Sequence, residues 1–222
     1  MLDAGQRRRR GKEAAMNQTI REGYRQSGLF LEQVVGGVTK DSFEGPGLGE
    51  WTVRELIGHS TRGLVTVEQY LAAPAKAINL QSAVAYYGSA ASSAIPPSSP
   101  LHAQILQRAR DAAKELGDEP AKAIAVMRKR VQALVEKTPD DAPMTVIGGR
   151  GMRLIDYLPS RCLELVVHSL DIAKATGQSV QAPPIALQVC LHLMADVAQA
   201  HNKGEMLLLA LTGRESLPQG WV

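Results

Sequence analysis

Five polar side chains share one face of a helix that the sequence predicts over residues 154–175. At about 100° per residue, one line along this helix contains Tyr157, Arg161, Glu164, His168 and Asp171. Apolar residues flank this line on both sides, so the line is expected to be buried. Burying charged groups is costly unless they pair with one another or bind something. The line therefore predicts either an internal ion-pair network or a ligand site.

The pair Glu164 and His168 suggests that the ligand is a metal ion. The two residues are four apart, so both side chains point at one spot from adjacent helical turns. A third ligand from another helix would complete three protein ligands with open coordination positions, as catalytic metal sites require. Asp171 lies one turn beyond, where it can act as an outer hydrogen-bond partner or an extra ligand. In the alternative, these groups only pair among themselves, with Arg161 serving Glu164.

His59 is the best candidate for the third ligand. It lies on the flank of the apolar stripe of a helix predicted over residues 52–72. The other residues on its line are small or polar, which suits a residue that lines a cavity: Thr52, Gly63 and Thr66. Against this, a lone histidine is more often exposed or satisfied within a core. The remaining histidines, of which the last two are expected to be structural or exposed, fit less well: His102, His192 and His201.

Other side chains could contact a substrate. Arg161 or Arg214 would hold a carboxylate group, although either could instead be an ion-pair partner. Tyr157 could orient a ligand or simply be packed in the core. Cys162 lies off the polar line, so it is expected to be a core residue rather than a nucleophile.

Helices are expected to position all of these residues. Aromatic residues make up only 4% of the chain, so aliphatic residues must fill the core, which favours helices over sheets. Thr52, followed three residues later by Glu55, predicts a capping box at the start of its helix. Gly148 and Gly149 predict the turn of a small hairpin. The expected helices cover residues 17–38, 52–72, 83–94, 101–137 with a break near 117–120, 154–175 with Gly177 as terminator, and 183–201.

These elements predict an all-α protein built as a four-helix bundle, with the hairpin just before the last bundle helix. Residues 1–16 are expected to form a disordered basic tail, and residues 17–178 the metal-binding bundle. Residues 179–222 would then be a short helical extension, in which 206–214 could be a strand or a helical turn.

Charge and cysteine usage narrow the function classes. The net charge of +3 comes entirely from residues 1–15, which hold five basic and two acidic residues. A neutral body argues against a nucleic-acid-binding protein, although the basic tail could still touch nucleic acid or anionic lipid. The chain has two cysteines, no apolar run of membrane-spanning length and no signal peptide pattern. We therefore expect a cytoplasmic protein with no membrane partner.

Two segments resemble a known family. Residues 49–59, Gly-Glu-Trp-Thr-Val-Arg-Glu-Leu-Ile-Gly-His, resemble the W-[ST]-V-x-[DE]-L-x-x-H segment of the mycothiol-dependent maleylpyruvate isomerase family. Residues 161–173 resemble its second signature, R-x-x-E-x-x-x-H-x-x-D-[LI]-A. Residues 211–214, Leu-Thr-Gly-Arg, are similar to the ending of many members. The family belongs to the DinB-like superfamily of metal-binding four-helix bundles.

The resemblance implies that His59, Glu164 and His168 match the family's metal ligands. It implies a divalent ion, often zinc, with mycothiol as a thiol cosubstrate of some members. The leading hypothesis is an isomerase or S-transferase that activates a small thiol for attack on a small electrophile. The alternatives are a metal-dependent hydrolase and a non-catalytic metal- or ligand-binding module. A homodimer through an exposed bundle face is a further expectation.

Overall fold

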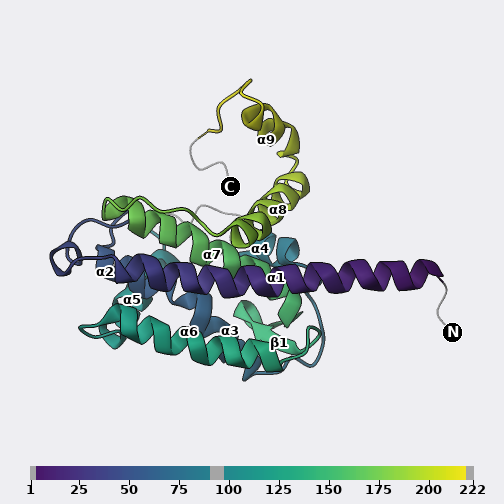
Figure 1. The fold of residues 1–222 in the computed structure, drawn as a ribbon, viewed down its shortest axis with the longest axis horizontal. Coiled ribbons are helices and arrows are strands. Elements are labelled where there is room, and N and C mark those ends of the chain that lie inside the picture. Colours follow the sequence, from purple (N-terminus) through teal and green to yellow (C-terminus); the bar gives the residue numbers. More distant parts are fainter. Residues whose placement is uncertain (1–3, 91–97, 219–222) are drawn as a thin grey trace.

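The computed structural model describes residues 4–90 and 98–218 and shows an all-α fold (Figure 1). Its α-helices are α1 (Ala4–Gly36), α2 (Val53–Ser60), α3 (Arg62–Leu71), α4 (Ala83–Ala90), α5 (Pro100–Glu115), α6 (Pro120–Lys137), α7 (Leu154–Ala175), α8 (Pro184–Ala200) and α9 (Gly204–Leu211). Short 3-10 turns form η1 (Lys40–Ser42) and η2 (Ile147–Gly149), and a hairpin joins β1 (Pro143–Val146) to β2 (Arg150–Arg153). The predicted fold class is confirmed, because helices dominate and the sheet has two strands.

Four helical segments form the bundle: α1, α2 with its continuation α3, α6 and α7. Helix α1 lies along α7 and α6, and α3 packs against both α6 and α7 (Figure 1). Helix α5 covers α2, while α8 packs on α1 and α7. Aliphatic side chains fill the interior and are fully buried, among them Leu31, Leu56, Ile57, Leu64 and Leu165. The four-helix bundle expected from the sequence is therefore present.

Local signals set the boundaries around α7 as predicted. Strands β1 and β2 pair antiparallel, with Val146 opposite Arg150. Gly148 and Gly149 have positive φ angles of 78° and 71°, which the hairpin turn requires. Gly177 has a φ of 67° and follows the end of α7, which confirms it as the helix terminator.

The helix predicted over residues 52–72 is divided into two helices at Thr61. The capping box at its start is confirmed: the Thr52 hydroxyl accepts from the Glu55 amide at 3.2 Å, and the Glu55 carboxylate accepts from the Thr52 amide at 3.1 Å. At the division, the hydroxyl of Ser60 donates to the backbone of the preceding turn, as does that of Thr61. Such bonds compete with the helical ladder, which explains a break that the apolar period could not reveal.

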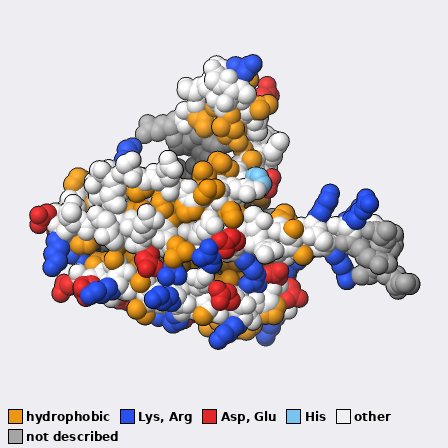
Figure 2. Space-filling model, viewed as in Figure 1, with side chains coloured by type: hydrophobic (Ala, Val, Ile, Leu, Met, Phe, Trp, Pro, Cys, Tyr) orange, Lys and Arg blue, Asp and Glu red, His pale blue; other side chains and the backbone are white. Residues whose placement is uncertain are grey.

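Helix α1 begins at Ala4, well before the expected Asn17, so it includes most of the segment expected to be disordered. Arginine, lysine, glutamine and alanine are strong helix formers, and no proline interrupts the segment. This part of α1 projects from the bundle and carries exposed basic side chains (Figures 1 and 2). None of the described helices is both long and apolar enough to cross a membrane.

The remaining predicted elements differ only in their ends. Helices α5 and α6 fill the range predicted over 101–137, with the expected break between them. Helix α4 ends at Ala90, and the predicted continuation to residue 94 lies outside the described residues. The segment 206–214, for which the sequence allows a strand or a helical turn, contains most of helix α9.

A close approach between α2 and α5 fixes the position of His59. A Cβ atom added to Gly58 would lie 2.5 Å from the backbone nitrogen of Ala113 and 2.6 Å from the carbonyl oxygen of Ala109. Both contacts are with backbone atoms, which cannot move aside as a side chain can. Only glycine therefore allows the two helices to pack at this distance.

We predict that Gly58→Ala destabilises the protein by about 1–3 kcal/mol, because α2 and α5 must separate to admit the methyl group. Urea unfolding followed by circular dichroism measures this change. Gly36→Ala is the matched control: its Cβ would meet nothing within 4 Å, so its free energy of unfolding should be unchanged or slightly higher. Equal stability of the two variants would contradict the close approach.

The two free cysteines are core residues, as expected for Cys162. Cys162 is 0% exposed and Cys190 is 4% exposed. Burial raises the pKa of the Cys190 thiol to about 12 and raises the pKa of Cys162 well above its usual value. We predict that neither thiol reacts with iodoacetamide in the folded protein at pH 8, since the thiolate is the nucleophile. Mass spectrometry should find both modified after guanidinium unfolding, and rapid modification of the folded protein would refute the assignment.

Candidate metal centre

Three side chains that the sequence singled out converge between α2 and α7. His59 lies in the last turn of α2, while Glu164 and His168 occupy successive turns of α7. Each offers a ligand atom, and these atoms all lie within 4.8 Å of one another. The His168 Nε2 atom is 3.4 Å from the Glu164 Oε2 atom. The two imidazole rings meet edge to face, with centroids 4.9 Å apart. The structure thus brings the predicted ligands together.

Asp171 orients His168 from the next turn of α7. The His168 Nδ1 atom is 3.1 Å from the Asp171 Oδ2 atom. This contact leaves Nε2 facing Glu164. A carboxylate on the outer nitrogen of a ligand histidine fixes the ring and makes it a stronger donor to a metal. Of the two roles considered for Asp171, the geometry supports the outer partner.

Burial and charge set the protonation of the three residues. Burial lowers the pKa of His59 to about 4, with the charge of His168 contributing, so this ring is neutral. Burial alone would raise the pKa of Glu164, but the His168 hydrogen bond and the Arg161 charge outweigh it and lower that pKa to about 2. Burial disfavours the His168 cation, yet its bonds with Asp171 and Glu164 raise its pKa to about 9. The cluster therefore holds an ionised carboxylate between a neutral and a cationic imidazole.

The cluster fits a divalent metal ion. Two imidazoles and one carboxylate form a donor set that suits Zn²⁺ and other divalent first-row ions. The Nδ1 atom of His59 is buried and has no hydrogen-bond partner among the described residues. Buried polar atoms without partners are rare in folded proteins. This orphaned atom shows that the polar groups do not satisfy one another completely, as a purely structural network would.

Arg161 is buried beside the cluster without pairing directly with Glu164. It is 7% exposed, and no ion pair within 4.0 Å joins these two residues in the described structure. Its guanidinium lies over the rings of Tyr157 and Tyr86, at 4.8 and 5.7 Å from their centroids. The alternative in which Arg161 directly neutralises Glu164 is therefore not the arrangement found. Tyrosine faces hold the cation instead.

Tyr157 and Arg214 lie in other environments. Tyr157 is fully buried, and its hydroxyl donates to the Thr66 hydroxyl at 2.9 Å. Of the two roles expected for Tyr157, this environment is that of a packed core residue. Arg214 is exposed and donates to the Thr212 carbonyl at 3.2 Å. It follows α9, which packs against α8 (Figure 1). The structure does not bring Arg214 to the three candidate ligands.

Aromatic side chains around the cluster were missed by sequence reasoning. The indole of Trp51 stacks on the His59 ring with centroids 4.4 Å apart and planes at 30°. Tyr86 meets Tyr157 edge to face at 5.2 Å, and Tyr70 lies 5.5 Å from Tyr157. The sequence offered one signal for them: aromatic residues make up only 4% of the chain, so the position of each one is informative.

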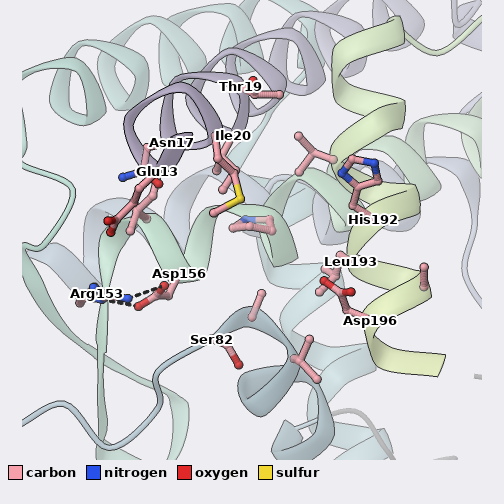
Figure 3. Close-up of a pocket in the computed structure, with 17 residues that line it drawn as sticks. Glu13, Asn17, Thr19, Ile20, Ser82, Arg153, Asp156, His192, Leu193 and Asp196 are labelled. Atoms are coloured by element: carbon pink, nitrogen blue, oxygen red, sulfur yellow. Dashed lines mark hydrogen bonds and ion pairs between the residues drawn. The ribbon is translucent and has the colours of Figure 1, made fainter. Parts of the chain in front are cut away.

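The other histidines lie apart from this cluster, as expected. The Nε2 atom of His102 is 3.7 Å from a carboxylate oxygen of Glu50. His192 and His201 are exposed. His192 lines a groove of about 450 Å³ formed by α1, α4, α7 and α8, where Arg153 pairs with Asp156 (Figure 3). This groove contains none of the three candidate ligands.

Comparison with known proteins places the chain in a family. Residues 24–173 match the family described as the mycothiol maleylpyruvate isomerase N-terminal domain. No curated protein and no solved structure matches the chain. The match spans about two thirds of the sequence and includes both segments that supply the candidate ligands. The chain therefore belongs to the mycothiol maleylpyruvate isomerase N-terminal domain family of metal-binding, DinB-like proteins.

Proposed function

We propose that this protein is a metal-dependent enzyme that activates a low-molecular-weight thiol, of the mycothiol type, for attack on a small electrophile. One observation carries the proposal: the ligand atoms of His59, Glu164 and His168 lie within 4.8 Å of one another, beside an oriented Asp171. A divalent ion with three protein ligands retains open positions and lowers the pKa of a thiol or water that binds there. The name of the matching family supports mycothiol as the proposed thiol.

The residues around the cluster have distinct roles in this proposal. Glu164 supplies a negative oxygen, and His59 a neutral imidazole whose unprotonated ring nitrogen can bind a metal without first losing a proton. His168 would give up a proton if a metal bound, and its contact with Asp171 keeps the ring in place. Arg161 forms no ion pair within 4.0 Å with a described carboxylate, although its charge helps to keep Glu164 ionised. In this proposal the same positive charge attracts an anionic part of the substrate.

The proposed reaction forms one bond to sulfur. The thiol proton passes to solvent, and the sulfur electron pair forms a C–S bond to one carbon of an electrophilic alkene, while the π electrons of that alkene move onto its electron-withdrawing group. Retention of the thiol, with a proton delivered to the neighbouring atom, gives a conjugate. Alternatively, rotation about the resulting carbon–carbon single bond, followed by cleavage of the C–S bond and release of the thiolate, restores the double bond and gives an isomer. Turnover that requires added thiol supports this reaction, whereas turnover of an ester or amide without thiol would replace it with metal-assisted hydrolysis.

We predict that the protein as purified or after incubation with Zn²⁺ binds about one equivalent of divalent metal, and that His168→Ala abolishes this binding. Elemental mass spectrometry after gel filtration measures the bound metal. His192→Ala is the matched control, because this histidine is exposed in the groove away from the cluster. Retention of metal by His168→Ala, or its absence from the wild type, would overturn the proposed centre.

We predict that Asp171→Asn weakens metal binding by about 10- to 100-fold, because the neutral amide orients and polarises His168 less well. Competition with a chromophoric chelator measures the affinity. Asp156→Asn is the control: Asp156 is on the same helix, but its carboxylate pairs with Arg153. Equal affinities in both variants would show that Asp171 does not act through His168.

A further inference from the structure

The two histidines of the proposed centre are held in different ways. The outer nitrogen of His168 meets the Asp171 carboxylate at 3.1 Å. His59 has no such partner: its Nδ1 atom is buried without a hydrogen bond, and no ion pair reaches its ring among the described residues. A hydrogen bond therefore does not fix rotation of the His59 ring about its Cβ–Cγ bond. Another contact must do so if the ring is to meet a metal at a defined angle.

That contact is with Trp51. Its indole lies face to face with the His59 ring, with centroids 4.4 Å apart and planes at 30°. The His59 ring also meets the His168 ring edge to face, with centroids 4.9 Å apart. Stacking opposes rotation of the ring, which would turn its edge into the indole face. It also leaves the ring nitrogens free to donate to a metal.

The backbone holds Trp51 in place independently of its side-chain N–H group. The Trp51 carbonyl accepts from the Gly47 amide at 2.8 Å, and its own amide donates to Leu48 at 3.0 Å. The next residue is Thr52, the capping residue that fixes the start of α2. The indole Nε1 atom has no hydrogen-bond partner among the described residues. The aromatic face, rather than the N–H group, is therefore the part of Trp51 that the structure uses.

We propose that Trp51 is a positioning residue that holds the His59 ring in its metal-binding orientation by stacking. The inference rests on the proposed metal centre and deepens it. It divides the task of orienting the two imidazoles: a carboxylate holds the ligand on α7, and an indole holds the ligand on α2. Removing the ring of Trp51 should therefore weaken metal binding while the fold persists.

The test compares Trp51→Leu, which removes the aromatic face, with Trp51→Phe, which keeps one and removes the N–H group. Binding of Co²⁺ to each protein is measured by chelator competition, and its visible absorption reports the coordination geometry. We expect Trp51→Leu to bind Co²⁺ about tenfold more weakly, with an altered absorption spectrum. Trp51→Phe should remain close to the wild type in both measurements.

Phe43→Leu controls for loss of an aromatic ring as such. Phe43 is 6% exposed and precedes the same helix, and its ring contacts Arg54 at 4.7 Å. Thermal melting measures the stability that each variant loses, while the Co²⁺ affinity and spectrum of Phe43→Leu should stay unchanged. If Trp51→Leu does not fold, Trp51→Met makes the same comparison with a longer apolar chain.

Two results would overturn the inference while leaving the proposed centre intact. In the first, Trp51→Leu binds Co²⁺ with wild-type affinity and spectrum, so stacking does not position His59. In the second, Trp51→Phe is as weak as Trp51→Leu, so the N–H group matters and the aromatic face does not. A wild-type protein that binds no Co²⁺ would overturn both the inference and the proposed function.

Discussion

Keeping the carboxylate of Glu164 ionised while it is partly buried between α2 and α7 is the constraint on which the site depends. Burial alone favours the protonated form, and the cost of the charge must be offset locally. His168 and Arg161, one turn away on either side, provide that offset. Each then needs support of its own, which Asp171 gives to the imidazole and tyrosine rings give to the guanidinium. Along this face of α7, each charged side chain is therefore stabilised by contact with its neighbours.

Glycines at two helix crossings let α2 and α3 pack close enough for His59 to reach Glu164 and His168. A Cβ at Gly58 would meet the backbone of α5, and a Cβ at Gly63 would lie 2.6 Å from Leu165 of α7. These glycines stand on either side of His59. Close approach of α2 to α5 and of α3 to α7 sets both the depth and the direction of the segment formed by α2 and α3. The position of the third candidate ligand is therefore a packing result, whereas Glu164 and His168 are aligned by helical geometry alone.

This difference explains what the sequence could predict. The spacing of Glu164, His168 and Asp171 is local, so a helical wheel was enough to place them on one face. The flank position of His59 was informative because α2 is amphipathic. The break at Thr61, the stacking of Trp51 and the cation-π contacts of Arg161 depend on how separate elements meet. The periodicity of one helix does not predict contacts between separate elements. The exposed position of Arg214 likewise depends on how α9 packs against α8, so its sequence context did not predict it.

The charges of the cluster explain how Glu164, His168 and Asp171 can be stable together both without and with a metal ion. With a pKa near 9, His168 carries a proton at neutral pH and supplies a positive charge between the carboxylates of Glu164 and Asp171. A divalent ion would displace that proton and take over its electrostatic role, since a ligand imidazole must be neutral. The two carboxylates would then balance the ion, and Arg161 would contribute the remaining positive charge. A centre of this kind favours an anionic ligand, and a thiol that loses its proton on binding is one.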